Sequence, residues 1–351
     1  MKLKLPTLHP TLKKVLRYTI FIGISAAFIY MAFKEVKLDE LIEKIKGAEL
    51  IWVAAAIAAG IISCVSRALR WQIMASPLGY KTNFWTTFHG IMVGYMVNFA
   101  IPRGGEVARA AIVSKTEKIP LTTMIGTIVA ERLVDLLCMG IVLLLAVGLQ
   151  FETLQKAFEL FSASNTDGGE SSGISLIQIA GIGFVVVAVL FFIFRKKIQA
   201  LALYKKVIEF VRGFGDGIKS LLTIKKPIQF IFHSIVIWVM YYLMVYLCFF
   251  ALDSTLHLGW EAGLTVLVMS TIAILLPAPG GMGTFHYFVA LGLTLYGIEN
   301  SDGVVYATIA HASQMIMFIG VGSASMITLL IMQRKQLAGE TATTNTKQDS
   351  K

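Results

Sequence analysis

The feature that most constrains this 351-residue chain is a series of apolar stretches about as long as a membrane is thick. A bilayer core of about 30 Å takes roughly 20 apolar residues as a helix. Such stretches cover residues 15–33, 50–66, 121–149, 174–194, 228–252 and 304–332. Only 15% of the residues are charged, against about 25% in soluble proteins. The sequence therefore predicts an all-α integral membrane protein and excludes a cytosolic enzyme, a secreted disulfide scaffold and a disordered chain.

Two further apolar regions are interrupted by proline and glycine. Residues 84–100 run into a Pro-Arg-Gly-Gly turn at 102–105, and residues 262–298 are broken by Pro and Gly at 277–281. We expect about 6–8 transmembrane helices in all, with the two broken regions as re-entrant hairpins. Two short full crossings are an alternative for the second region. Broken segments in two halves are typical of inverted-repeat transporters. Whether the two halves of this chain form an inverted repeat stays open.

Loop charges predict how the chain is oriented. Residues 195–226 are rich in Lys and Arg, which favours the cytoplasm. Residues 150–173 have four acidic residues and a single base, Lys156, which favours the outside. The basic segment 1–14 and the hydrophilic tail 333–351 are both expected in the cytoplasm, flanking a single membrane domain over 15–332. The first hairpin then enters from the cytoplasm and the second from outside. We expect a multi-pass protein of a bacterial-type cytoplasmic (inner) membrane.

Several charged residues fall inside the apolar stretches. Arg67 and Arg70 are three residues apart and share a helix face, while Glu131, Arg132 and Asp135 lie within the run 121–149. A charge at the bilayer centre costs at least about 2.5 kcal/mol, so these side chains should pair with other helices or line a wet cavity. A buried ion-pair network that only fixes helix packing is the alternative, and for the two arginines so is a simple interfacial anchor.

The first break brings a second group of polar residues into the membrane, namely Asn98, Arg103, Glu106 and Arg109. Proline and glycine unwind the helix there and free backbone N–H groups that can face an anion. The planar guanidinium of arginine suits phosphate, and Glu106 is about one turn from each arginine. A plain turn capped by surface charge is the alternative.

The second break has no formal charge. Gly280 and Gly281 expose backbone there, and His286 follows within two turns. A neutral histidine could bind a headgroup or carry a proton, although a packing role is the alternative. His311 and Gln314 in the last span could reach the same cavity.

In chain order, these motifs resemble those of the lysylphosphatidylglycerol synthase transmembrane (flippase-like) family. The resemblance covers residues 15–332 and is most specific in the Pro-Arg-Gly-Gly-Glu block at 102–106 and the Glu-Arg-x-x-Asp block at 131–135. It implies a domain that moves lipids, notably aminoacylated phosphatidylglycerol, between leaflets. Only nineteen hydrophilic residues follow Met332, so we do not expect the soluble aminoacyltransferase domain, nor synthesis of the lipid. His286 stands where the resemblance would place a glutamate.

The leading hypothesis is a lipid flippase in which four arginines hold a headgroup phosphate, namely Arg67, Arg70, Arg103 and Arg109. Glu131 and Asp135 would balance those arginines, or hold a cationic headgroup when one is present. The alternatives are a membrane enzyme acting on a lipid phosphate, or a membrane partner of a separate synthetase. No metal-ligand spacing or nucleophile pair supports catalysis, and we expect neither cofactor nor metal. The net charge of +10 is explained by topology rather than by nucleic acid. Expected partners are membrane lipids; a homo-oligomer or a lipid-modifying enzyme stays open.

Overall fold

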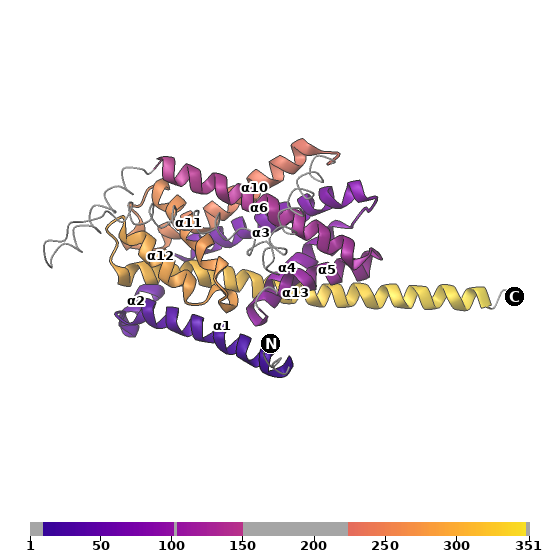
Figure 1. Cartoon of the computed structure of the whole chain (residues 1–351), viewed down its shortest axis with the longest axis horizontal. Helices are drawn as coiled ribbons and strands as arrows, with labels where there is room; N and C mark the ends of the chain where they lie inside the picture. The colour runs from indigo at the N-terminus through magenta and orange to yellow at the C-terminus, as the bar shows by residue number, and fades with distance from the viewer. Residues whose placement is uncertain (1–9, 102–103, 150–223, 349–351) are drawn as a thin grey trace, which may run out of the picture. The chain divides into compact units, whose positions relative to one another are not determined.

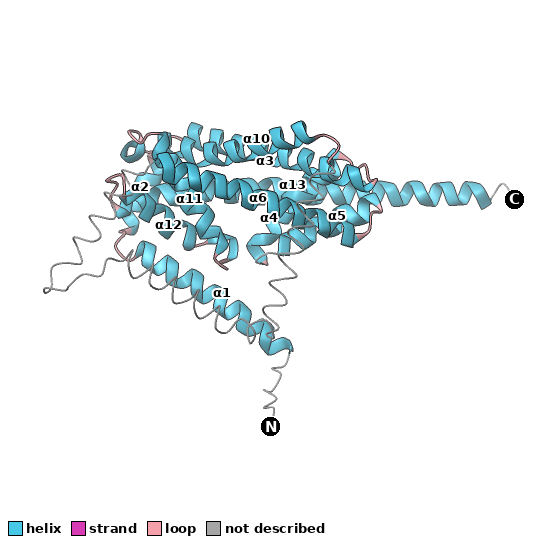
Figure 2. Cartoon of the chain, turned by 45° about the horizontal axis from the view of Figure 1, so that its top comes forward, coloured by secondary structure: helices cyan, strands magenta, loops and turns pink. Residues whose placement is uncertain are grey.

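The computed structural model describes residues 10–101, 104–149 and 224–348, and every regular element in these ranges is a helix (Figures 1 and 2). The α-helices are α1 (Pro10–Phe33), α2 (Leu38–Lys46), α3 (Leu50–Ala75), α4 (Phe84–Ala100), α5 (Gly104–Glu117), α6 (Leu121–Leu149), α10 (Pro227–Tyr246), α11 (Trp260–Leu275), α12 (Thr284–Thr294) and α13 (Asn300–Gln348). Short 3₁₀ turns are η1 (Ser76–Leu78), η2 (Leu247–Ala251), η3 (Asp253–Thr255) and η4 (Pro279–Gly281).

Helix length and hydropathy confirm the membrane class. Four described helical segments are long and apolar enough to cross a bilayer, namely Leu50–Leu78, Leu121–Leu149, Pro227–Ala251 and Asn300–Arg334. Residues 18–33 of α1, together with α2, form a fifth candidate that bends by 83°. The predicted span at 174–194 and most of the basic loop 195–226 lie outside the described residues. α13 continues through the predicted tail as far as Gln348.

The first Pro/Gly break closes a helical hairpin. Helices α4 and α5 run antiparallel, since Gly94 lies against Gly105 while Gly90 lies against Val113. The backbones approach so closely that a Cβ on Gly105 would overlap the Gly94 carbonyl oxygen. Only two residues with no side chain can share that position, which explains why this hairpin needs glycine on both helices.

The second break closes another hairpin, and its tip contacts the first. Helices α11 and α12 pack antiparallel, and η4 forms the turn between them, with Gly280 at φ +59°. A Cβ on Gly280 would overlap the ring of Phe99 at the end of α4. Figures 1 and 2 draw α11 and α12 towards the α2 end of the bundle, and α4 and α5 towards the other. The two hairpins therefore approach from opposite ends and meet tip to tip; here the tips are residues 99–101 and 279–282.

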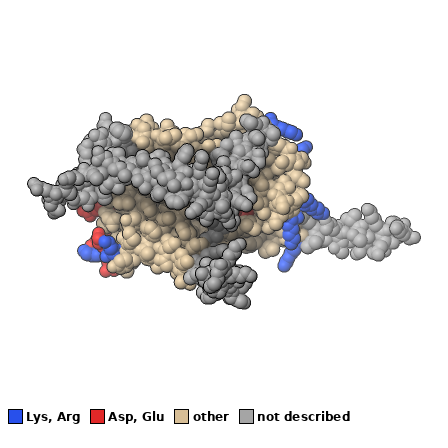
Figure 3. All heavy atoms as spheres, in the orientation of Figure 1, with Lys and Arg blue, Asp and Glu red and all other residues tan. Residues whose placement is uncertain are grey.

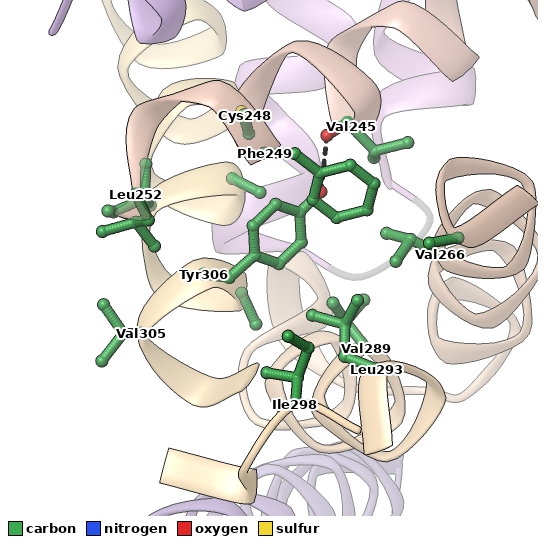
Figure 4. Packing of buried hydrophobic residues seen from close by; sticks show 14 of the residues in the cluster. Val245, Cys248, Phe249, Leu252, Val266, Val289, Leu293, Ile298, Val305 and Tyr306 are labelled. Atoms are coloured by element: carbon green, nitrogen blue, oxygen red, sulfur yellow. Dashed lines mark hydrogen bonds between the residues drawn. The ribbon is translucent and has the colours of Figure 1, made fainter. Parts of the chain in front are cut away.

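A buried aromatic core supports the second hairpin (Figure 4). Phe249 and Tyr306 stack with ring centroids 4.9 Å apart, and the Tyr306 hydroxyl donates to the Val245 carbonyl oxygen at 2.5 Å. Val289 and Leu293 of α12 complete this cluster. The contacts join α10 and η2 to α12 and α13, so the second hairpin rests on a fixed base.

Charged side chains gather at the two ends of the face shown in Figure 3, and uncharged residues form the belt between them. Large apolar side chains are exposed on several helices, such as Leu144 on α6 at 73% and Ile228 on α10 at 82%. Such exposure in a helical bundle is typical of a surface that faces acyl chains.

The close helix contact in the first hairpin predicts that one small substitution destabilises the protein. Gly105→Ala should lower the melting temperature of the purified protein by several degrees, because the added methyl must push α4 and α5 apart at a cost of about 1–3 kcal/mol. Gly126→Ala on α6 is the matched control, since a Cβ there meets nothing within 4 Å. Equal melting temperatures for the two variants would contradict the observed hairpin contact.

Candidate functional site

Two carboxylates of α6 tie together arginines from two other helices. Glu131 pairs with Arg67 of α3, and its other oxygen lies 3.1 Å from Arg109 of α5. Asp135, one turn further along α6, lies 3.0 Å from Arg67 and 2.6 Å from Arg70. Each carboxylate thus bridges at least two guanidinium groups. The sequence-predicted pairing of the Glu-Arg-x-x-Asp block with these arginines is what the structure contains.

Arg132 and Glu106 extend the network towards the surface of the bundle. Arg132 lies 2.9 Å from Glu106, 3.4 Å from Glu131 and 3.5 Å from Asp135. We refer to the whole set as the charged cluster, which comprises Arg67, Arg70, Glu106, Arg109, Glu131, Arg132 and Asp135. Four arginines against three carboxylates give this set a formal charge of +1. The net charge of the cluster is therefore positive, even with every carboxylate ionised.

Exposure changes steeply across the charged cluster. The side chains of Arg70 and Glu131 are 0% and 1% exposed, whereas those of Glu106 and Arg132 are 40% and 43% exposed. Asp135 lies between these extremes at 14%. The interior of the cluster is closed, and one side of it is open.

The open side lies partway along an apolar helix. Arg132 follows Leu121, the first residue of α6, by eleven positions, or about 16 Å of helix, which is roughly half the thickness of a bilayer core. Its neighbours on the same helix face are Val129 and Leu136, which are 50% and 47% exposed. An accessible guanidinium therefore sits among apolar side chains of the kind that face lipid.

Polar groups that the sequence analysis did not single out complete the buried side. Arg67 donates to the Tyr241 hydroxyl at 2.6 Å, and Arg70 donates to the Ser234 hydroxyl at 3.3 Å. The Arg109 guanidinium stacks over the Trp71 ring, 5.0 Å from its centroid. Tyr241 and Ser234 lie seven residues apart, hence on one face of α10. That spacing was the available signal, but isolated hydroxyls in an apolar helix look like packing residues.

The residues of the first break are divided between two roles. The Asn98 side chain accepts a hydrogen bond from the Gly105 backbone N–H at 2.8 Å, so it caps the start of α5. Glu106 and Arg109 follow on that helix and reach the charged cluster. Arg103 lies outside the described residues, and its predicted role in phosphate binding stays a prediction.

The residues of the second break form a separate group. Gly280 accepts a hydrogen bond at its carbonyl oxygen from His311 Nε2, 2.9 Å away, and Gly281 is buried beside it. The His286 ring lies 5.1 Å from that of His311 and 5.5 Å from that of Phe33 on α1. Within the described ranges, no ion pair or hydrogen bond joins His286 to the charged cluster. The sequence-predicted site is therefore two neighbouring centres rather than one.

An aromatic path links these centres. The Phe99 ring at the first hairpin tip lies 6.3 Å from Phe318, which stacks on Tyr95 at 4.4 Å. The Tyr95 hydroxyl is 3.3 Å from that of Tyr241, which in turn bonds Arg67. The tip contact and the charged cluster thus share a continuous set of packed side chains.

Metal chemistry has no evident ligands in the described part of the chain, where no group of three or more His, Cys, Asp or Glu side chains is placed to hold an ion. The donors that do converge are guanidinium groups and hydroxyls. These suit a phosphate or carboxylate, since arginine binds such planar or tetrahedral oxyanions through two parallel hydrogen bonds.

Fold and site together define an all-α, multi-pass membrane protein with a charged centre inside the bundle. Residues 18–322 match the lysylphosphatidylglycerol synthase TM region, and the chain belongs to that family. The sequence resemblance to this family is thereby confirmed.

The chain is similar to three proteins from archaea, two of which are named as membrane proteins. It is 24% identical to a UPF0104 membrane protein of Methanocaldococcus jannaschii, over 92% of this chain and 97% of that protein. It is 22% identical to a UPF0104 membrane protein of Methanothermobacter thermautotrophicus, over 82% and 88%. A 27% identity to glycosyltransferase AglD of Haloferax volcanii covers only 37% of this chain and 21% of that protein. No solved structure matches the chain.

The closed side of the charged cluster predicts a large stability effect. Glu131→Gln should destabilise the protein by about 3–5 kcal/mol, because it leaves buried guanidinium groups short of a counter-charge. Arg109→Gln in the same chain should restore part of that loss, since one excess positive charge is then removed. Melting of each purified variant measures both effects. A Glu131→Gln protein as stable as the wild type would contradict the assigned network.

Proposed function

We propose that this protein moves a phospholipid, or another lipid with an anionic or aminoacylated headgroup, between the leaflets of a membrane. The observation that carries the proposal is the position of Arg132, which is 43% exposed at mid-length of α6 between exposed Val129 and Leu136. A charge at such a depth is costly unless it meets a polar partner. In the structure Glu106 is that partner, 2.9 Å from Arg132, and because both side chains are accessible, a lipid headgroup passing along α6 would be able to exchange with it.

The charged cluster suits a headgroup of either kind. Arg132 can pair with a phosphate oxygen, while Glu106, equally accessible at 40%, can accept from an ammonium group. The buried arginines Arg67, Arg70 and Arg109 would act behind them, since they hold a net positive field without facing the lipid. The acyl chains would stay in the bilayer, so only the headgroup would need shelter.

The two hairpins would control access to this path. Their tips touch at Phe99 and Gly280, and the aromatic set from Phe99 to Tyr241 connects that contact to Arg67. We propose that α4–α5 and α11–α12 are re-entrant from opposite faces, with α4–α5 entered from the cytoplasm. Separation of the tips on either side would then expose the cluster alternately, as in transporters with broken helices.

Transport in liposomes tests the proposal. Wild-type protein with a fluorescent anionic phospholipid should equalise the probe between leaflets, as measured with an outer-leaflet quencher. Arg132→Gln should slow this by about tenfold or more, because the accessible positive charge is lost, while the melting temperature should change little since partly exposed ion pairs contribute about 0–1 kcal/mol. Arg132→Lys should retain part of the rate.

Lys46→Gln on α2 is the charge-matched control and should transport like the wild type. The proposal would be wrong if Arg132→Gln transported at the wild-type rate, or if the wild type moved no probe. The rival function, an enzyme acting on a lipid phosphate, would instead appear as headgroup turnover detected by mass spectrometry in the same liposomes.

A further inference from the structure

A second polar site lies at one end of the bundle, away from the open side of the charged cluster. A cavity of about 300 Å³ opens between the end of α3 and the start of α10. One wall is formed by positions 69, 72 and 73 on one face of α3, continued by Ser76 at the start of η1. Another includes positions 229 and 233 on one face of α10, with Lys226 just before that helix. Neither the charged cluster nor the hairpin tips contribute a lining residue.

The lining of this cavity is basic. Lys81, Lys225 and Lys226 all contribute to it, and no acidic side chain does. No ion pair joins these lysines to a carboxylate of the described residues. They therefore concentrate positive charge in a concave site, which raises the local concentration of an anion.

Two polar atoms of the lining residues add a second, independent observation. Thr82 Oγ1 and His233 Nδ1 are buried and have no hydrogen-bond partner in the structure. A buried polar atom without a partner costs about 1–3 kcal/mol, so such atoms are rare unless a ligand or water completes them. Thr82, in the segment between η1 and α4, and His233 of α10 both line the same cavity.

The cavity also receives the N-terminus of α10. That helix begins at Pro227 and has no side-chain cap, so its first backbone N–H groups are available at the end where the helix dipole is positive. The helix runs for 20 residues, and Gln229 of its first turn lines the cavity. Lysines, a helix N-terminus and unpartnered donors or acceptors are the elements of a phosphate site.

We propose that this cavity binds a phosphate group, carried by a lipid headgroup or present as free phosphate. The site lies at the end of apolar helices, with exposed Trp85 nearby in sequence on α4, which is the level at which headgroups lie. Arg70 does not line the cavity, but its sequence neighbour Leu69 does. The Arg70 guanidinium donates to Ser234, the neighbour of His233, at 3.3 Å. Binding there requires no lipid movement, so the proposal is independent of the transport function.

Lysine protection in the wild-type protein tests the site directly. The full chain in phosphatidylcholine nanodiscs is treated with an amine-acetylating reagent, and modification at each lysine is followed by mass spectrometry. Inorganic phosphate, or phosphatidylglycerol in the disc, should slow acetylation of Lys81, Lys225 and Lys226 by about tenfold. Lys34 and Lys37, in the connection between α1 and α2, and Lys46 on α2 should react at unchanged rates and serve as internal controls.

Substitution of the three cavity lysines should give a matching loss of binding. The triple variant Lys81→Gln, Lys225→Gln, Lys226→Gln should weaken binding of the same probe by about tenfold, whereas Lys34→Gln, Lys37→Gln, Lys46→Gln should not. Protection by phosphate in phosphatidylcholine discs would identify free phosphate as the ligand, and protection by phosphatidylglycerol alone would identify the lipid headgroup. Equal acetylation of all six lysines with and without both probes would overturn the proposal.

Discussion

The pairing of Glu131 and Asp135 with the arginines of α3 and α5 is the interaction on which the rest of the structure depends. Burying Arg67, Arg70 and Arg109 without carboxylates would cost several kcal/mol for each charge. Because Glu131 reaches both α3 and α5, it fixes the first hairpin against the main bundle. Hydrophobic burial cannot do this in a membrane, where lipid competes equally well for apolar side chains, so ion pairs and close glycine contacts set helix positions instead.

The same cluster is both scaffold and site because its exposure is uneven. Its closed side holds three helices together, and its open side presents Arg132 and Glu106 to whatever passes along α6. The second hairpin needs no charge of its own: the Phe249–Tyr306 core supports it, and it meets the first hairpin through Gly280 and Phe99. A polar solute crossing the bundle would have to part that contact.

The sequence predicted the buried charges and the two helix breaks, which are costly in a membrane. It missed contacts made by common aromatic and hydroxyl side chains. Charges inside apolar runs are conspicuous, so Arg67, Glu131 and Asp135 could be selected and their pairing expected. Both Pro/Gly breaks were visible as interruptions of apolar helices. The hydrogen bond from Arg67 to Tyr241 was missed because the sequence has many aromatic residues. Nothing marks one tyrosine hydroxyl as a partner until the positions of the helices are known. The contact of Phe99 with Gly280 depends on tertiary packing between distant segments, which spacing alone does not encode.

In the proposed function a lipid headgroup passes along α6 at the charged cluster, and the hairpin tips separate to admit it. Spin labels at Ile101→Cys and Met282→Cys, which are 48% and 38% exposed in the wild type, would report that separation once Cys64, Cys138 and Cys248 are replaced with alanine. In phosphatidylcholine discs the two labels should broaden each other's spectra. Adding phosphatidylglycerol should remove the broadening from a substantial fraction of the molecules. Broadening that stays unchanged in protein that transports the lipid would contradict the account.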